Sequence, residues 1–192
     1  MLNQLRPAVM SLLALTLLLG LAYPLAMTGL AQAVVPNAAN GSLVRVGGRV
    51  VGSRLIGQMF TRPDYLQGRP SAAGDGYDPT QSGGSNLGPL DPKLADRIAK
   101  SAAALGGDRR TLPADAVTTS ASGLDPDISP EFARRQVARI AAARHMDAAA
   151  VQALIDQHTE GRFAGLIGEP RVNVLAVNLA LDQRFRTGKP QS

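Results

Sequence analysis

The sequence predicts an α+β protein, with one N-terminal transmembrane helix followed by a single mixed α/β soluble domain. Three observations support this fold class. No charged residue or histidine occurs between Pro7 and Val44, β-branched residues flank a glycine pair in the segment that follows, and capping residues mark several helix starts further on. A chain of 192 residues has room for about one soluble domain.

The apolar run at residues 8–33 is long enough to cross a membrane as a helix. About 20 residues at a rise of 1.5 Å each span a hydrocarbon core of ~30 Å, and a helix satisfies its own backbone groups. Pro24 lies inside the run and is expected to kink it. Residues 1–7 then form a short N-terminal segment, and residues 34–192 form the soluble domain.

A cleaved signal peptide is the alternative interpretation of this front segment. Ala31-Gln32-Ala33 is an acceptable small-x-small cleavage site. The apolar run is much longer than the usual signal core of about 7–15 residues, which favours a retained anchor. Arg6 precedes the run and three arginines follow it, so the positive-inside count is ambiguous. The signal-like front favours an extracytoplasmic soluble domain.

The first part of the soluble domain combines a hairpin, a glycine-rich loop and a helix. Gly47-Gly48 allows the positive φ angles of a two-residue hairpin turn within residues 41–60. The stretch "YDPTQSGGSNLGPLDP" at residues 77–92 is rich in turn-forming residues. A helix is expected after Asp91, with Pro92 in its first turn and a stop at Gly106-Gly107.

Two further helices and a C-terminal strand complete the predicted domain. Ser129 and Asp147 are the expected N-caps of the two helices. The first helix should bury Phe132, Val137, Ile140 and Ala141 and leave Arg134, Arg135, Arg139 and Arg144 in solvent; the second should place Val151, Leu154, Ile155 and His158 on one face. Residues 168–185 alternate as a strand does, although a helix fits them nearly as well. The polar tail after Phe185 is expected to be loose.

Composition and motifs argue against several function classes. The chain has a net charge of +5, but its basic residues are scattered without interleaved aromatics, so no nucleic-acid partner is predicted. It has no cysteine, and none of the phosphate-loop, serine-hydrolase or zinc-protease motifs occurs. His158 is interpreted as a packed or capping side chain, and Asp125-Pro126-Asp127 as a turn. We therefore expect no catalytic residue, no metal site and no self-sufficient enzyme.

Ser82-Gly83-Gly84 is the one candidate for a phosphate contact. It is similar to the "LSGGQ" signature of ABC ATPases, in which amides at a helix N-terminus meet a phosphate. Here the next helix is expected only near Asp91, which makes a phosphate cradle a weak prediction. The preferred interpretation is a structured, partner-facing loop made of Ser82, Gly83, Gly84, Ser85 and Asn86.

Six ordered segments resemble the KdpC family, the C subunits of bacterial Kdp potassium-transporting P-type ATPases. They are "GSRLIGQ" (52–58), "GRPSA" (68–72), "SGGSNLGP" (82–89), "TTSASGLDP" (118–126), "ISP" (128–130) and "GEPRVNVLAVNLALD" (168–182). The resemblance covers nearly the whole chain. Two positions depart from the family pattern, because Leu66 stands where Phe is usual and Asp127 where His is common.

The resemblance implies an inner-membrane complex that carries K⁺. Its expected partners are a channel-like A subunit, a P-type ATPase B subunit, a small F subunit and the surrounding membrane lipid. The first hypothesis is a non-catalytic accessory subunit that anchors and stabilises this assembly at the outer face of the inner membrane.

Two other hypotheses remain open. In the main alternative the chain is an ATP-binding catalytic chaperone that raises the nucleotide affinity of the B subunit, with ATP at Ser82, Gly83 and Gly84. That alternative needs these residues in the cytoplasm. Outside the family, the chain would be a membrane-anchored extracytoplasmic binding module for an unknown small ligand.

Overall fold

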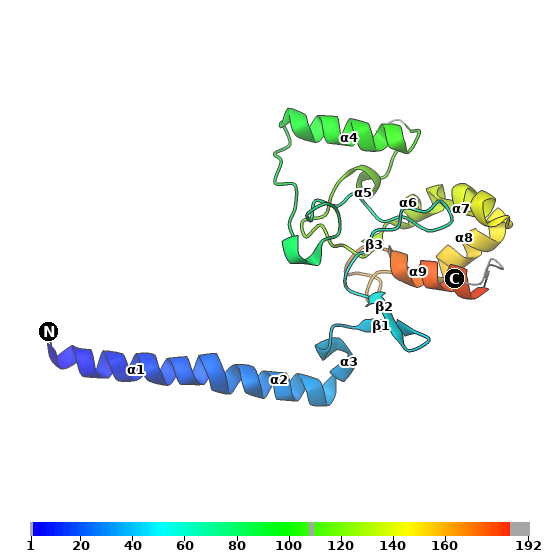
Figure 1. Cartoon of the computed structure of the whole chain (residues 1–192). Coiled ribbons are helices and arrows are strands. Elements are labelled where there is room, and N and C mark those ends of the chain that lie inside the picture. Colours follow the sequence, from blue (N-terminus) through cyan, green and yellow to red (C-terminus); the bar gives the residue numbers. More distant parts are fainter. Residues whose placement is uncertain (1, 108–109, 185–192) are drawn as a thin grey trace. The chain divides into compact units, whose positions relative to one another are not determined.

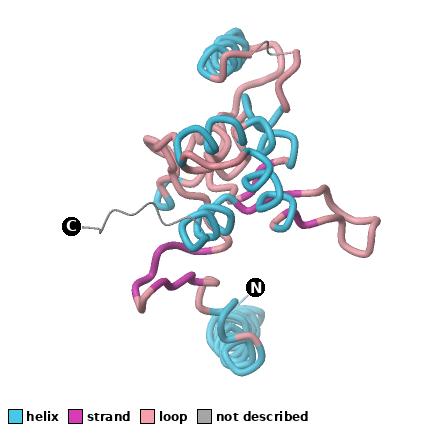
Figure 2. Tube along the Cα trace, turned by 90° about the vertical axis from the view of Figure 1, so that its right-hand side faces the viewer, coloured by secondary structure: helices cyan, strands magenta, loops and turns pink. Residues whose placement is uncertain are grey.

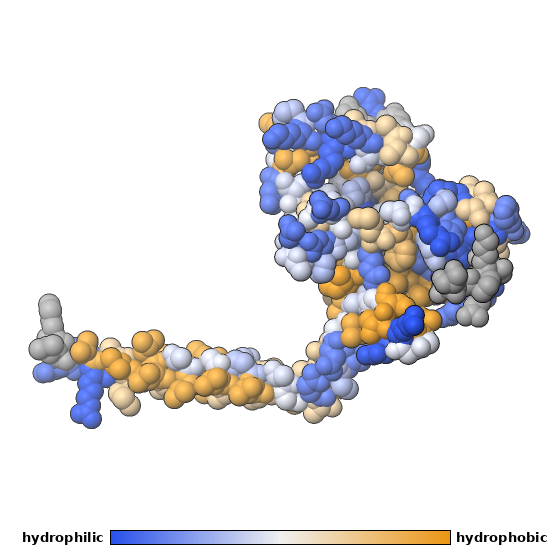
Figure 3. All heavy atoms as spheres, in the orientation of Figure 1, coloured by the Kyte–Doolittle hydropathy of each residue, from blue (hydrophilic) through white to orange (hydrophobic). Residues whose placement is uncertain are grey.

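A computed structural model describes residues 2–107 and 110–184 and divides the chain into two compact units, Met1–Val51 and Gly52–Ser192. The first unit is built on one helix of 30 residues that runs from Leu5 to Val34, and its most apolar stretch has a mean hydropathy of 2.1. By length and composition it can cross a membrane. Its side chains are almost all exposed, and Figure 3 shows apolar residues along much of its length.

The long helix is interrupted in its middle by a π-helical segment. The element α1 (Leu5–Leu17) is followed by η2 (Leu18–Ala22), which is π-helical, and then by α2 (Tyr23–Val34). Pro24 occupies the first turn of α2. Proline cannot donate a hydrogen bond and clashes with the carbonyl four residues before it, here that of Gly20 within η2. The disturbance expected at Pro24 therefore takes the form of this π-helical segment.

Short elements follow the long helix. The helix α3 (Pro36–Ala39) leads into the paired strands β1 (Leu43–Val46) and β2 (Arg49–Ser53). Gly47 and Gly48 have φ angles of 57° and 82°. These positive values are typical of a type I′ hairpin turn, so the predicted hairpin is confirmed.

The second unit contains a small antiparallel sheet in the order β3-β5-β4. The strands are β3 (Asp127–Ile128), β4 (Thr159–Glu160) and β5 (Arg171–Asn173). In the register of the sheet Val172 of β5 lies opposite Ile128 on one side and Thr159 on the other. Val172 is fully buried, so the central strand contributes directly to the core.

Helices supply most of the remaining core side chains of this unit. They are η3 (Pro79–Gln81), a 3₁₀ turn, and the α-helices α4 (Pro92–Ala104), α5 (Ala114–Val117), α6 (Pro130–Arg135), α7 (Val137–Arg144), α8 (Ala148–Gln157) and α9 (Val174–Arg184). Figure 1 shows α6 to α9 grouped together with α5 nearby, and α4 further off. Fully buried side chains in this core include Leu66, Ile140, Val151, Leu154, Ile155, Val177 and Leu181.

Local capping chemistry sets the predicted helix starts. The Asp91 carboxylate accepts the Lys93 N–H at 2.9 Å, and the Ser129 hydroxyl accepts the Phe132 N–H at 3.1 Å. The Asp147 carboxylate accepts the Ala149 N–H at 2.9 Å. These bonds satisfy backbone donors that have no partner within the helix, and they confirm the three expected N-caps.

The predicted C-terminal strand is mostly wrong. Only Arg171–Asn173 is a strand, and α9 begins at Val174. The side-chain oxygen of Asn173 accepts the Ala176 N–H at 3.1 Å, which starts the helix. Val174, Val177 and Leu181 are all buried, a helical spacing that the strand interpretation had missed. The expected loose tail lies outside the described residues.

Arg144 also departs from the prediction, because its side chain is buried rather than solvated. Its Nε donates to the Asp64 carbonyl oxygen at 2.6 Å, and its Nη2 lies 2.8 Å from an oxygen of the Asp182 carboxylate. The guanidinium also lies 5.0 Å from the centre of the Tyr65 ring. A buried cation is tolerated when it is paired in this way.

Side-chain amides hold the segment that contains Asp64 and Tyr65 against α7 and α9. The buried Asn178 bonds both the N–H and the carbonyl of Leu66, at 2.7 and 2.9 Å. Gln136 does the same for Gln67, at 2.9 and 3.0 Å. The four bonds replace those of a neighbouring strand at Leu66 and Gln67, and residues 62–67, which begin with a turn, form a strap across the helices.

Candidate functional site

Three loops of the second unit converge on a fourth, the segment 118–126. The Gly57 N–H donates to the Leu124 carbonyl at 2.7 Å, and the Ser71 hydroxyl donates to the Gly123 carbonyl at 2.7 Å. We call this cluster the loop platform and define it as residues 55–58, 68–77, 82–84 and 118–126. Four of the six sequence segments singled out above thus lie together, although the chain separates them widely.

Arg69 and Asp125 clamp two of these loops together. The Arg69 Nη1 lies 3.0 Å from an oxygen of Asp125, and Nη2 donates to the Thr119 carbonyl at 3.3 Å. Both side chains are mostly buried, with exposures of 20% and 31%. The arginine is therefore already satisfied by protein groups, and its role in the platform is to join loops.

Tyr77 lies next to the Arg69–Asp125 ion pair. Its hydroxyl donates to the Arg69 carbonyl at 2.7 Å, and its N–H donates to the Ser71 hydroxyl at 2.8 Å. Burial, reinforced by the negative charge of Asp125, raises the pKa of Tyr77 to about 12. The phenol is therefore neutral at physiological pH and acts as a hydrogen-bond donor within the platform.

Two glycines allow the loops to approach this closely. A Cβ atom at Gly57 would lie 2.5 Å from the Asp125 carbonyl oxygen and 2.6 Å from the Tyr77 ring. Gly123 has a φ of 68°, and a Cβ there would lie 2.7 Å from the Gly83 carbonyl oxygen. Backbone contacts of this kind cannot relax without moving a loop, so only glycine fits at either position.

The predicted partner-facing loop takes part in the platform through its first three residues. The Ser82 hydroxyl and the Gly83 N–H both donate to the Ser122 carbonyl oxygen, each at 2.9 Å. A Cβ at Gly84 would lie 3.0 Å from the Ala121 carbonyl oxygen. Ser85 is half-buried, and Asn86 is exposed with a φ of 53°.

The position of Ser82–Gly84 in the fold is not that of a phosphate cradle. The segment follows the C-terminal end of the 3₁₀ turn η3, and α4 begins only at Pro92. Phosphates bind where free amides converge at a helix N-terminus. Here the Gly83 amide and the Ser82 hydroxyl are both directed at a carbonyl of the protein itself.

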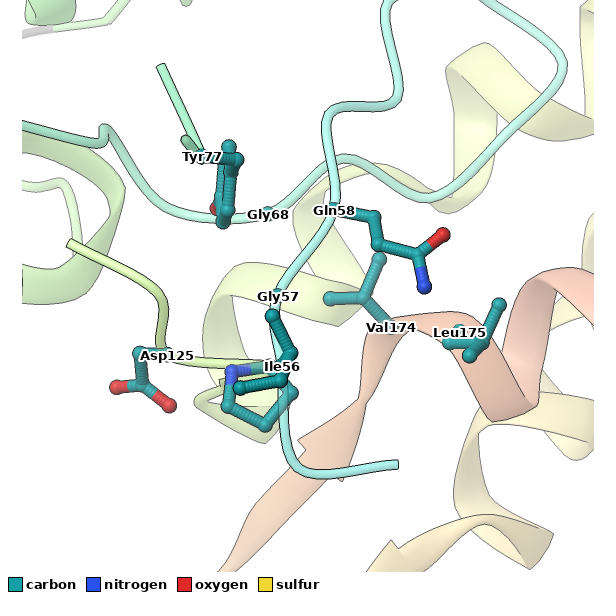
Figure 4. Close-up of a pocket in the computed structure, with 9 residues that line it drawn as sticks. Ile56, Gly57, Gln58, Gly68, Tyr77, Asp125, Val174 and Leu175 are labelled. Carbon is teal, nitrogen blue, oxygen red and sulfur yellow. The ribbon is translucent and has the colours of Figure 1, made fainter. Parts of the chain in front are cut away.

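A small pocket and an open depression lie in the platform. The pocket in Figure 4 has a volume of about 10 Å³ and is lined by residues that include Gly57, Tyr77, Asp125 and Val174. That volume holds about one water molecule, far less than a nucleotide site of several hundred Å³. It reflects the close packing of the loops.

The open depression measures about 530 Å³. Its lining residues are Leu55, Ile56, Ser82, Ser120, Ala121, Ser122, Leu124, Asp125 and Pro126. Asp125 is the sole charged residue among them, and it is negative and paired with Arg69. Triphosphates are bound by basic side chains and free amides, so this lining does not suit a nucleotide.

The histidines have structural explanations, and no metal cluster is found in residues 2–107 and 110–184. His158 ends α8, with its Nδ1 2.9 Å from the Leu154 carbonyl oxygen, which agrees with the expected capping role. His145 ends α7 with a φ of 55°, a left-handed C-cap conformation.

Asp127 lies at the edge of the platform. Its carboxylate accepts the Asn173 Nδ2 at 2.9 Å and lies 3.2 Å from the Arg171 Nε. Burial raises the pKa of Asp127 despite these partners. The departure from the family pattern at this position is thus accommodated by a local ion pair and hydrogen bond.

Comparison with known proteins identifies the family. The family model described as "KdpC: K+-transporting ATPase, c chain" matches residues 5–183. The chain belongs to the KdpC family. A KdpC subunit of a potassium-transporting ATPase from Beijerinckia indica is 55% identical over 194 residues, covering 99% of this chain and 98% of the relative.

Two further KdpC subunits are slightly more identical over a slightly smaller share of the chain. The protein from Caulobacter vibrioides is 58% identical over 188 residues, covering 96% of this chain and 95% of its own. The protein from Gemmatimonas aurantiaca is 58% identical over 191 residues, covering 97% and 96%. The resemblance inferred from six segments is therefore confirmed along the whole chain. The clamp between Arg69 and Asp125 and the buried Arg144 escaped the sequence analysis, because neither pairing leaves a local pattern.

Proposed function

We propose that this KdpC-family chain is a non-catalytic accessory subunit of a K⁺-transporting ATPase. It anchors and stabilises the assembly of a channel-like A subunit, a P-type ATPase B subunit and a small F subunit. Its apolar helix at residues 8–33 crosses the inner membrane among lipid, and its soluble domain at residues 34–192 lies on the outer face. K⁺ is carried by the complex, and this chain holds no cofactor.

The bonding of the Ser82 hydroxyl and the Gly83 amide to the protein's own backbone carries this proposal. Hydroxyl and amide donors that a nucleotide would need are bonded to the Ser122 carbonyl. The adjacent depression presents no basic side chain. These features support a preformed loop surface, and they do not favour the alternative in which the chain binds ATP and raises the nucleotide affinity of the B subunit.

The Leu5–Val34 helix supports the anchoring role. Its 30 residues exceed the length needed to cross the hydrocarbon core. A Cβ at Gly29 would meet nothing within 4 Å, and one at Gly20 would meet only the Thr16 side chain at 4.0 Å, so these glycines leave room for another helix to approach closely. The same helix would keep the soluble domain at the membrane surface, where subunits of the complex meet.

Topology tests the proposal directly, because cellular ATP does not reach the outer face. The chain has no natural cysteine, so single cysteines can be placed at Leu90, which is 97% exposed, and at Gln4, which precedes the helix. We expect an impermeant thiol reagent to label Leu90→Cys in intact cells and Gln4→Cys only after permeabilisation. The reverse pattern would place the loop platform in the cytosol and overturn the proposal.

A further inference from the structure

The loop between β4 and β5 exposes three large apolar side chains. Phe163, Leu166 and Ile167 have exposures of 77%, 82% and 68%. Figure 2 shows this loop extending away from the helices of its unit. The core is complete without these side chains, and apolar groups gathered at the end of a loop commonly mark an interaction site.

Backbone hydrogen bonds hold the tip of this loop in one shape. The Phe163 N–H donates to the Ile167 carbonyl at 2.8 Å, and the Leu166 N–H donates to the Phe163 carbonyl at 3.1 Å. Ala164 and Gly165 between them have φ angles of 50° and 75°. A left-handed conformation is unfavourable for alanine, so the turn is a specific structure. A preformed tip loses little conformational freedom on binding.

The base of the loop is electrically balanced. Arg162 lies 2.8 Å from Glu169, and Arg171 lies 2.8 Å from Glu160. The other ion pairs of this region are Arg171–Asp127 at 3.2 Å and Arg54–Glu160 at 3.7 Å. Three arginines thus face three carboxylates. Attachment to an anionic lipid surface relies on excess basic charge, and this base has none to offer.

We propose that the apolar tip formed by Phe163, Leu166 and Ile167 docks into an uncharged apolar recess on a companion protein subunit of the ATPase. The balanced charges favour a protein recess over anionic lipid headgroups. The inference rests on the proposed function, since that function supplies the companion subunit. It adds a specific contact surface that is separate from both the membrane helix and the loop platform.

Photo-crosslinking in the assembled ATPase tests the nature of the partner. A benzophenone amino acid replaces Leu166 in the full-length chain within native membranes, and the matched control carries it at the exposed Leu90. We expect a protein–protein adduct from position 166 that is at least about tenfold stronger than from position 90. Adducts with lipid alone, no adduct from position 166, or equal yields from both positions would overturn the inference.

Replacing apolar side chains by charged ones tests how much the apolar tip contributes to binding the companion subunits. The double variant Phe163→Asp/Leu166→Asp removes the apolar tip without touching a buried group, and Leu90→Asp is its control. Loss of this burial should weaken retention of the companion subunits by about tenfold or more, whereas the control should retain them. Unchanged retention in the double variant, alongside an intact wild-type complex, overturns only the tip contact. Absence of a wild-type complex would also overturn the proposed function.

Discussion

Gly83 and Gly84 are adjacent glycines, but the space around their α-carbons differs. A Cβ at Gly83 meets nothing within 4 Å, whereas one at Gly84 would lie 3.0 Å from the Ala121 carbonyl oxygen. Neither residue has a positive φ, so backbone strain does not separate them. The pair therefore isolates the effect of loop packing from the loss of a glycine.

We predict that Gly84→Ala weakens the platform by about 1 kcal/mol and lowers high-affinity K⁺ uptake, while Gly83→Ala behaves as wild type. The ATP affinity of the complex should be the same in both variants, because the Ser82 and Gly83 donors are bonded to the Ser122 carbonyl. Uptake in cells and ATP titration of the purified complex provide the measurements. A selective loss of ATP affinity in either variant would instead support the nucleotide alternative.

Asp64 belongs to the network that holds the strap. Its carboxylate accepts two hydrogen bonds from Arg62, at 2.9 and 2.6 Å, and lies 3.9 Å from the buried Arg144. Burial alone would raise its pKa, but the hydrogen bonds and positive charge of Arg62 outweigh burial and lower the pKa of Asp64 below its ordinary value. The folded state thus favours the ionised form.

A lowered pKa predicts a defined pH dependence of stability. The contribution of Asp64 is present above its unfolded pKa of about 4 and is lost as the pH falls through the lower folded pKa. We expect Asp64→Asn to reduce the free energy of unfolding by about 1 kcal/mol at pH 7, with the difference from wild type fading below pH ~4. Urea denaturation of the full-length chain in detergent at several pH values measures it.

Asp96→Asn, at an exposed position on α4, is the control for Asp64→Asn and should stay within about 0.5 kcal/mol of wild type. A destabilisation by Asp64→Asn that is the same at pH 7 and pH 3 would argue against an ionic role for Asp64.

At the level of elements, features set by neighbouring residues could be predicted from the sequence, whereas features set by tertiary contacts could not. The starts of α4, α6 and α8 follow from a capping side chain within three residues, and the hairpin follows from Gly47-Gly48. Residues 171–184 were ambiguous because both periods fit the sequence. Burial of every third or fourth side chain and the hydrogen bond from Asn173 select the helix.

The same holds for the candidate site: its loops could be recognised in the sequence, but their contacts with one another could not. Its segments could be singled out in the sequence, and glycine, serine and proline correctly marked them as loops. Their meeting depends on contacts such as Ser82 with Ser122, 40 residues apart, and Arg69 with Asp125, 56 residues apart. Arg144 was misassigned to solvent for a similar reason, since its partners Asp64 and Asp182 lie 80 and 38 residues away.

At the scale of the whole molecule, the two units divide the work of a subunit. The helix Leu5–Val34 has no buried residue and needs lipid or another helix to cover it. The second unit has its own core, with Leu66, Ile140 and Val177 fully buried. This independence implies that the membrane helix can be altered without unfolding the second unit.

We therefore predict different outcomes for removing and for replacing the helix. Deletion of residues 8–33 should release a folded chain from membranes and prevent recovery of the complex, because the anchor is lost. Replacement by a leucine-rich helix of equal length should keep the chain in the membrane but lower recovery of the complex, because bulky side chains would replace the small surfaces of Gly20 and Gly29. Membrane fractionation and co-purification separate the two effects. Full recovery with the leucine-rich helix would mean that the span serves only as an anchor, and an intact complex after deletion would mean that the soluble contacts suffice.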